Sequence, residues 1–131
     1  MPVEEVKIMS AAVTIDDSIL GTVRKMVVGR EDDTTFDTDL VIHINTVFDV
    51  LYQVGIGTED PFFIIDDSAI WSDFIDGTLF RSVLSFMVLR VKMLFDPPQS
   101  SFVLSSMKEQ SEELLVRMTY ETTIAEMEGR L

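Results

Sequence analysis

Apolar side chains recur every three or four residues after Asp16 and Asp17, which is the spacing of one face of an amphipathic helix. The apolar positions are Ile19, Leu20, Val23, Met26 and Val27. Gly29 then offers the left-handed conformation that commonly closes a helix. The pattern predicts a short helix up to Gly29, followed by a polar surface loop over residues 30–35.

A second and longer apolar stripe begins after Asp37 or Thr38, either of which is placed to cap a helix. The apolar positions are Leu40, Ile44, Val47, Phe48, Leu51 and Val54. Gly55 and Gly57 follow and end the pattern. We expect a helix here that buries one face.

The sequence changes character after these glycines. Asp60-Pro61 is a turn signal, and the Phe-Phe-Ile-Ile run over residues 62–65 has high strand propensity. We expect a short β-strand or hairpin here, paired either within the chain or with a neighbouring subunit. Trp71 follows in a helical turn or irregular connection. We expect its side chain to anchor the segment between the second and third helices to the core.

Residues 78–95 are apolar on most sides, which predicts a third helix at the centre of the fold. This helix must end at Asp96-Pro97-Pro98, because proline lacks the amide donor and disfavours helical geometry in the residue before it. The chain is therefore expected to turn a sharp corner at this block.

Ser100 or Ser101 is placed to cap a last long helix with a charged outer face. Its apolar positions are Leu104, Met107, Leu114, Leu115 and Met118. The helical period is lost beyond Met118. We expect residues 119–131 to form a tail that a partner orders.

These elements predict a mainly α fold, a compact bundle of about four helices with a short β-strand or hairpin between the second and third helices. We divide the chain into an N-terminal extension (1–16), a helical domain (17–118) and a C-terminal tail (119–131).

The charge balance limits the possible partners. The chain has 23 Asp and Glu against 10 Lys and Arg, a formal net charge of −13. Such a surface repels phosphates and anionic lipids, so direct binding to duplex DNA or to a membrane is disfavoured. Solubility alone explains the charge equally well. The N-terminus lacks the basic start of a signal peptide, and charged residues interrupt the most apolar stretch, so we expect a soluble protein.

No group of residues predicts catalysis or metal binding. The chain has no Cys and one His, and His43 stands alone in its helix. The Asp-Asp pairs at 32–33 and 66–67 lack the alternating spacing of a calcium loop, so we interpret them as turn carboxylates. Gly55-x-Gly57 lacks the third glycine of a dinucleotide site. We expect no catalytic residue, no metal and no cofactor.

The apolar residues exceed what one small core requires. Core filling explains most of the eight Met residues. The surplus apolar faces of the third and fourth helices, together with the weakly periodic tail, favour self-association. We expect the subunit contacts to involve Phe62, Phe63, Met107 and Met118.

Several short stretches occur in an order and spacing that we recognise. They are residues 36–39 running into 42–48, then 53–57, 71–74 and 95–101, and the Phe-Asp-Pro-Pro block that begins the last is the most specific. Together they resemble the head-tail connector, or adaptor, proteins of long-tailed bacteriophages and prophages. The resemblance covers about residues 17–118.

The resemblance implies a structural virion protein and not an enzyme. It implies a homo-oligomeric ring, usually of twelve subunits, that sits beneath the portal protein, extends the DNA channel and offers a docking surface to a tail-side stopper or tail terminator protein. The location would be the neck of the virion, and the host cytoplasm during assembly. Double-stranded DNA would pass without specific binding, because an acidic lumen repels phosphates.

Within this interpretation we expect the tail to dock on the portal. The docking residues would be Tyr120, Ile124, Met127 and Leu131. The family-like motif residues are expected to be capping, turn or corner groups rather than direct contacts. They are Asp37, Asn45, Trp71, Asp96, Pro97 and Pro98.

An acidic inhibitor that mimics DNA is the main alternative, because carboxylates on a small helical protein can imitate phosphate spacing. It would bind a basic nucleic-acid enzyme as a monomer or dimer, so the mass in solution distinguishes it from a ring. An enzyme that uses His43 with a nearby carboxylate is a more distant alternative.

Overall fold

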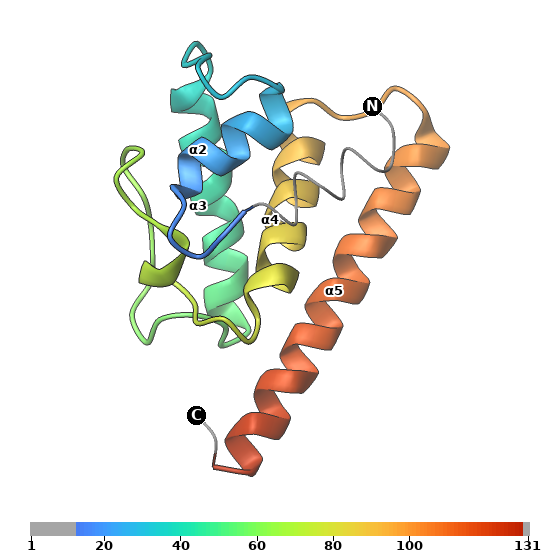
Figure 1. Cartoon of the computed structure of the whole chain (residues 1–131). Coiled ribbons are helices and arrows are strands. Elements are labelled where there is room, and N and C mark those ends of the chain that lie inside the picture. Colours follow the sequence, from blue (N-terminus) through green and yellow to red (C-terminus); the bar gives the residue numbers. More distant parts are fainter. Residues whose placement is uncertain (1–12, 130–131) are drawn as a thin grey trace.

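The computed structural model describes residues 13–129, and α-helices dominate this part of the chain (Figure 1). The four α-helices are α2 (Ile19–Val23), α3 (Asp37–Gln53), α4 (Phe80–Phe95) and α5 (Ser101–Met127). Two shorter elements are η1 (Arg24–Val28), a π-helical turn that continues α2, and η2 (Trp71–Asp73), a 3₁₀ turn. The predicted mainly α class is confirmed.

Several helix ends lie where the sequence predicts them. Ser18 caps α2, since its Oγ accepts a hydrogen bond from the Gly21 amide at 3.0 Å. Gly29 closes η1 with a φ of 92°. Helix α4 stops before the two prolines, and the Ser100 hydroxyl accepts a hydrogen bond from the Val103 amide to begin α5.

Helix α4 lies at the centre of the fold. It packs against α2, η1, α3 and α5, which explains why its sequence is apolar on most sides. Its buried side chains include Phe80, Val83, Leu84, Phe86, Met87 and Val91. Trp71 is fully buried beside this helix, and its indole N–H donates to the Thr22 hydroxyl at 3.2 Å. The predicted anchoring role of Trp71 is confirmed.

The Phe-Phe-Ile-Ile segment has no regular secondary structure, and it pairs with no strand among the described residues. The Ile64 amide donates to Asn45 Oδ1 at 2.8 Å, and Asn45 Nδ2 donates back to the Ile64 carbonyl at 3.0 Å. The Phe62 ring packs against Phe48 and Phe74. One amide side chain on α3 thus supplies the two hydrogen bonds that a partner strand would supply, so the predicted strand or hairpin is wrong. Within residues 13–129 the one β-type pairing is an isolated bridge between Ser18 and Ile70.

Asp37 is an ion-pair partner rather than a helix cap. The N-cap residue of α3 is Phe36, and Asp37 receives two hydrogen bonds from Arg24, Nε to Oδ1 at 2.9 Å and Nη2 to Oδ2 at 2.6 Å. Arg24 is buried, and it also donates to the Glu31 carbonyl. The hydrogen bonds that Arg24 donates to the Asp37 carboxylate raise the pKa of the Arg24 guanidinium above its ordinary value. This bidentate pair fastens η1 to the start of α3.

Candidate interaction surfaces

Helix α5 is the longest element, and it packs mainly on α4 (Figure 1). Its 27 residues correspond to about 40 Å at 1.5 Å per residue. Only Ser111, Met118 and Thr122 are buried along it. The helix continues through the segment predicted as a tail and ends at Met127, so the chain has no structural break at residue 119.

The outer face of α5 carries exposed apolar side chains. Phe102 is 80% exposed, Val116 67%, Tyr120 66% and Met127 78%. At 3.6 residues per turn these positions fall on one side of the helix, opposite the buried Ser111 and Met118. We call these four residues the outer α5 stripe. A helix with apolar residues on two opposite faces shows little net periodicity, which is why the sequence pattern fades here.

A cleft lies between the C-terminal half of α5 and two loops. Its volume is about 440 Å³. Its lining residues, which define the C-terminal cleft, are Gly55, Ile56, Gly57, Phe74, Ile75, Asp76, Thr78, Leu79, Tyr120, Glu121, Thr122, Ile124 and Ala125. Two of the predicted docking residues, Tyr120 and Ile124, meet in this cleft. Met127 belongs to the outer α5 stripe instead, and Leu131 lies outside the described residues.

One wall of the cleft depends on Gly57. This residue has a φ of 103°, and a Cβ added to it would collide with the Phe74 ring. The ring itself is buried and packs against Phe48. The turn after α3 is therefore fixed in place by an aromatic side chain from another segment.

Thr122 brings an unsatisfied polar group to the cleft. Its residue is 6% exposed, and its hydroxyl is buried without a hydrogen-bond partner. Leaving a buried hydroxyl unpaired costs about 1–3 kcal/mol. The other neighbouring threonines avoid this cost, because Thr119 and Thr123 donate to the carbonyls of Leu115 and Thr119.

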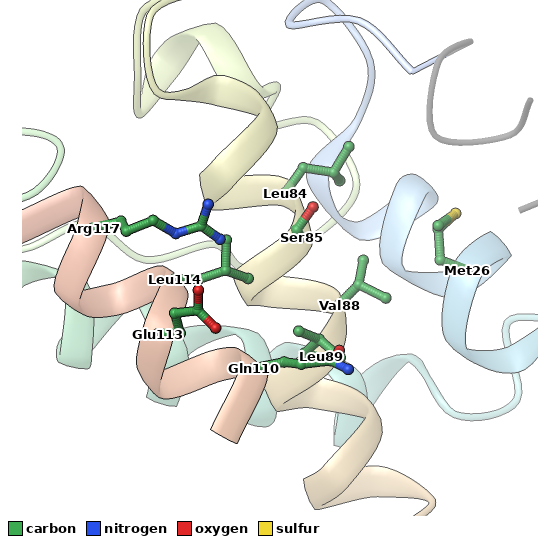
Figure 2. Close-up of a pocket in the computed structure, with 9 residues that line it drawn as sticks. All are labelled: Met26, Leu84, Ser85, Val88, Leu89, Gln110, Glu113, Leu114 and Arg117. Carbon is green, nitrogen blue, oxygen red and sulfur yellow. The ribbon is translucent and has the colours of Figure 1, made fainter. Parts of the chain in front are cut away.

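Two further grooves flank α5, which packs mainly on α4. Figure 2 shows the first, of about 380 Å³, with an apolar floor from α4, Met26 of η1 on one side, and Glu113 and Arg117 of α5 on the other. The second, of about 530 Å³, lies between α3 and α5 and includes Pro97, Arg90 and Lys108. The first groove includes α5 residues between 110 and 117, and the second includes α5 residues between 104 and 112.

The residues predicted to form subunit contacts do not share one surface. Phe63 is 67% exposed and stands beside the exposed Ile65, whereas Phe62 is partly buried in the aromatic cluster. Met107 is partly buried on α5, and Met118 is only 1% exposed, so it belongs to the core. In Figure 1 the loop that carries Phe63 lies on the opposite side of α3 and α4 from α5.

Two acidic residues between the helices serve as turn groups. Asp33 accepts a hydrogen bond from the Thr35 amide, and Asp66 accepts from the amide and hydroxyl of Ser68. Hydrogen bonds from Thr35 and Ser68 lower the pKa of these two carboxyls below the ordinary value. Over residues 13–129, no group of three or more His, Cys, Asp or Glu side chains is placed to hold a metal ion.

His43 lies on α3, where it is partly buried. None of the helices described is both long enough and apolar enough to span a bilayer.

Sequence reasoning missed the cleft and the Arg24–Asp37 pair. The signal for the pair was a charged residue, Arg24, between the apolar positions Val23 and Val27 of a short helix. The cleft had a weaker signal, the polar Thr122 on the same helix face as Met118.

The fold and its surfaces define a small α-helical protein whose exposed apolar faces are suited to association with other chains. The sequence profile of the phage connector protein family matches residues 19–124, which include α2, α3, α4 and most of α5. The chain belongs to this family, and the resemblance drawn from the motifs is confirmed. Membership makes it a structural protein of a phage. Comparisons with curated proteins and with solved structures gave no match.

Proposed function

We propose that this protein is a head-tail connector that forms a ring beneath the portal, extends the DNA channel and presents a docking surface to the tail. The observation that supports ring formation is the presence of two apolar patches on opposite sides of the molecule. One is the loop patch, Phe63 and Ile65, and the other is the outer α5 stripe. A closed ring of identical subunits needs two different, complementary faces, since each contact joins one face to the other.

The C-terminal half of α5 is the part proposed to meet the portal. It carries the exposed Tyr120 and Met127, and it forms one side of the C-terminal cleft. The ring face and the portal face adjoin at Tyr120, which belongs to both the outer α5 stripe and the cleft lining, whereas Thr122 and Ile124 line the cleft only.

The net charge of −13 suits a wall along which DNA passes without binding. Carboxylates repel phosphates across a screening length of about 8–10 Å at physiological ionic strength. An acidic lumen therefore favours passage over adhesion.

The test is single-particle imaging of the purified protein, alone and mixed with its portal. We expect a ring coaxial with the portal. The double variant with Phe63→Ser and Ile65→Ser should lose the ring, because it removes one of the two patches. Ile42→Ser is the matched control, since Ile42 is 57% exposed on α3 and belongs to neither patch. A monomer that ignores the portal would contradict the proposal, and rings that survive the double variant would exclude the loop patch as a contact.

A further inference from the structure

We propose that the C-terminal cleft binds an extended segment of a partner protein that carries one bulky apolar side chain flanked by Lys or Arg. The apolar side chain would fill the cleft, the Thr122 hydroxyl would form a hydrogen bond with the segment, and the basic groups would face the carboxylates at the rim. The proposal rests on the proposed function only for the identity of the partner, which would be the portal. The kind of segment that the cleft would bind is inferred from its shape, its lining, Thr122 and its charges, independently of the proposed function.

The cleft has the size and stiffness of a preformed binding site. Its volume of about 440 Å³ falls in the range of pockets that hold small ligands or large side chains. The contact between Gly57 and the Phe74 ring fixes one wall, and the opposite wall belongs to a continuous helix. A site that keeps its shape without a ligand loses less conformational entropy on binding.

The apolar lining determines which side chain of the segment can fill the cleft, and we call this side chain the anchor. Ile56, Leu79 and Ile124 contribute aliphatic surface to the cleft, and Phe74 contributes an aromatic ring. Such a lining gains free energy by removing a Leu, Met or Phe side chain from water. A polar side chain in the same place would lose its hydration without enough partners.

Thr122 is the independent sign of a missing ligand. In a helix the threonine hydroxyl normally donates to the carbonyl four residues earlier, as Thr119 and Thr123 do. The Thr122 hydroxyl makes no such bond, although it is buried. Rotation about the Cα–Cβ bond exchanges the methyl and the hydroxyl, so the hydroxyl can face a segment seated in the cleft. A backbone amide or carbonyl of that segment would pair with it.

The charges select the flanking residues. Asp76 and Glu121 are the charged residues of the lining, and both are acidic. The nearest residues along the chain include Asp73 on one side and Glu126 and Glu128 on the other. Lys or Arg beside the anchor would be attracted to this rim, and Asp or Glu would be repelled.

The test uses two synthetic decapeptides with a central Phe, one with flanking lysines and the other with flanking glutamates. Binding to the full chain is measured by fluorescence anisotropy and mapped by amide chemical shifts. We expect the lysine peptide to shift the resonances of cleft residues. Glu121→Lys should weaken its affinity about tenfold, and Thr122→Val should weaken it about threefold to tenfold. Glu109→Lys is the matched control, because Glu109 is exposed on the same helix outside the cleft and the charge change is identical.

Equal binding of the two peptides, or equal loss in the Glu121→Lys and Glu109→Lys variants, would overturn the charge selection. Shifts confined to other surfaces would overturn the site. Thr122→Val keeps the shape of the side chain, and its circular-dichroism spectrum should match that of the parent protein. This comparison separates a binding role from a folding role.

A parallel experiment with the portal keeps the two proposals distinct. If the parent protein binds portal, Glu121→Lys should lose this binding and Glu109→Lys should keep it. If the parent protein ignores the portal while the lysine peptide still binds the cleft, the connector assignment fails and the cleft assignment stands. If the portal binds both variants alike while the peptide still selects the cleft, the portal is excluded as the partner.

Discussion

Asn45 holds the Phe-Phe-Ile-Ile segment against α3, so its replacement by Ala should loosen that loop and destabilise the protein. The substitution removes both hydrogen bonds to Ile64, whose residue is only 2% exposed. A buried backbone group that loses its partner costs about 1–3 kcal/mol. Two such groups, partly relieved by water because Asn45 itself is half-buried, give an expected loss of about 2–4 kcal/mol.

The measurement is urea unfolding followed by far-UV circular dichroism and by the fluorescence of Trp71, the single tryptophan. With a denaturant slope of about 2 kcal/mol per molar, the midpoint should fall by about 1–2 M. Thr46→Ala is the control, because Thr46 is the exposed neighbour on the same helix and should change the stability by less than about 0.5 kcal/mol. If Asn45→Ala also changes the free energy of unfolding by less than that amount, packing of Phe62 and Ile64 holds the loop. The reasoning about the Asn45 amide would then be refuted.

Asn45→Asp adds a pH signature to this prediction. At neutral pH the carboxylate can accept from the Ile64 amide, but it faces the Ile64 carbonyl without a proton to donate. The fold should therefore raise the pKa of the new carboxyl. A carboxyl with a raised pKa binds its proton more tightly in the folded state, so stability relative to the parent protein should recover as the pH falls from 7 toward about 4. A loss that is constant over this range would contradict the assignment.

Four further substitutions probe other parts of the structure. Asp37→Ala leaves the buried Arg24 guanidinium unpaired, so it should lower the free energy of unfolding, measured in urea, by about 2–4 kcal/mol. Arg24→Met removes the buried charge and should lower it by about 1 kcal/mol. Equal losses in the two variants would contradict this account. Gly57→Ala combines a positive φ with a steric collision, so we expect a loss of more than about 2 kcal/mol by thermal unfolding. Ser68→Ala should raise the pKa of Asp66 toward its ordinary value of about 3.9, measured by NMR titration. Because the folded pKa of Asp66 is depressed, its stabilising effect is present above that ordinary value and is lost as the pH falls through the folded pKa.

The sequence predicted the helices and most of their ends because these depend on local signals. Gly29, the glycines after α3, the two prolines after α4 and the Ser100 cap each act within a few residues. The central position of α4 also followed from its sequence, since a helix that is apolar on most sides must be covered on most sides.

The errors arose where distant residues decide the structure. Strand propensity in the Phe-Phe-Ile-Ile run was real, but Asn45 lies 19 positions earlier and no local pattern reveals that it satisfies the Ile64 backbone. The continuation of α5 to Met127 was missed because its apolar residues lie on both faces. The C-terminal cleft depends on how α5 crosses the loop at Gly57, and a crossing angle cannot be read from periodicity.

The loop held by Asn45 also bears on the behaviour of the free protein before assembly. Its four consecutive apolar residues have the composition of an aggregation-prone segment, and two of them, Phe63 and Ile65, face solvent. Asp60-Pro61 precedes the run and a pair of aspartates follows it. Charged and strand-breaking residues of this kind at the ends of an apolar segment oppose its aggregation. These flanking residues disfavour the stacking of the run into fibrils. The hydrogen bonds between Asn45 and Ile64 also occupy backbone groups that a foreign strand would otherwise pair with.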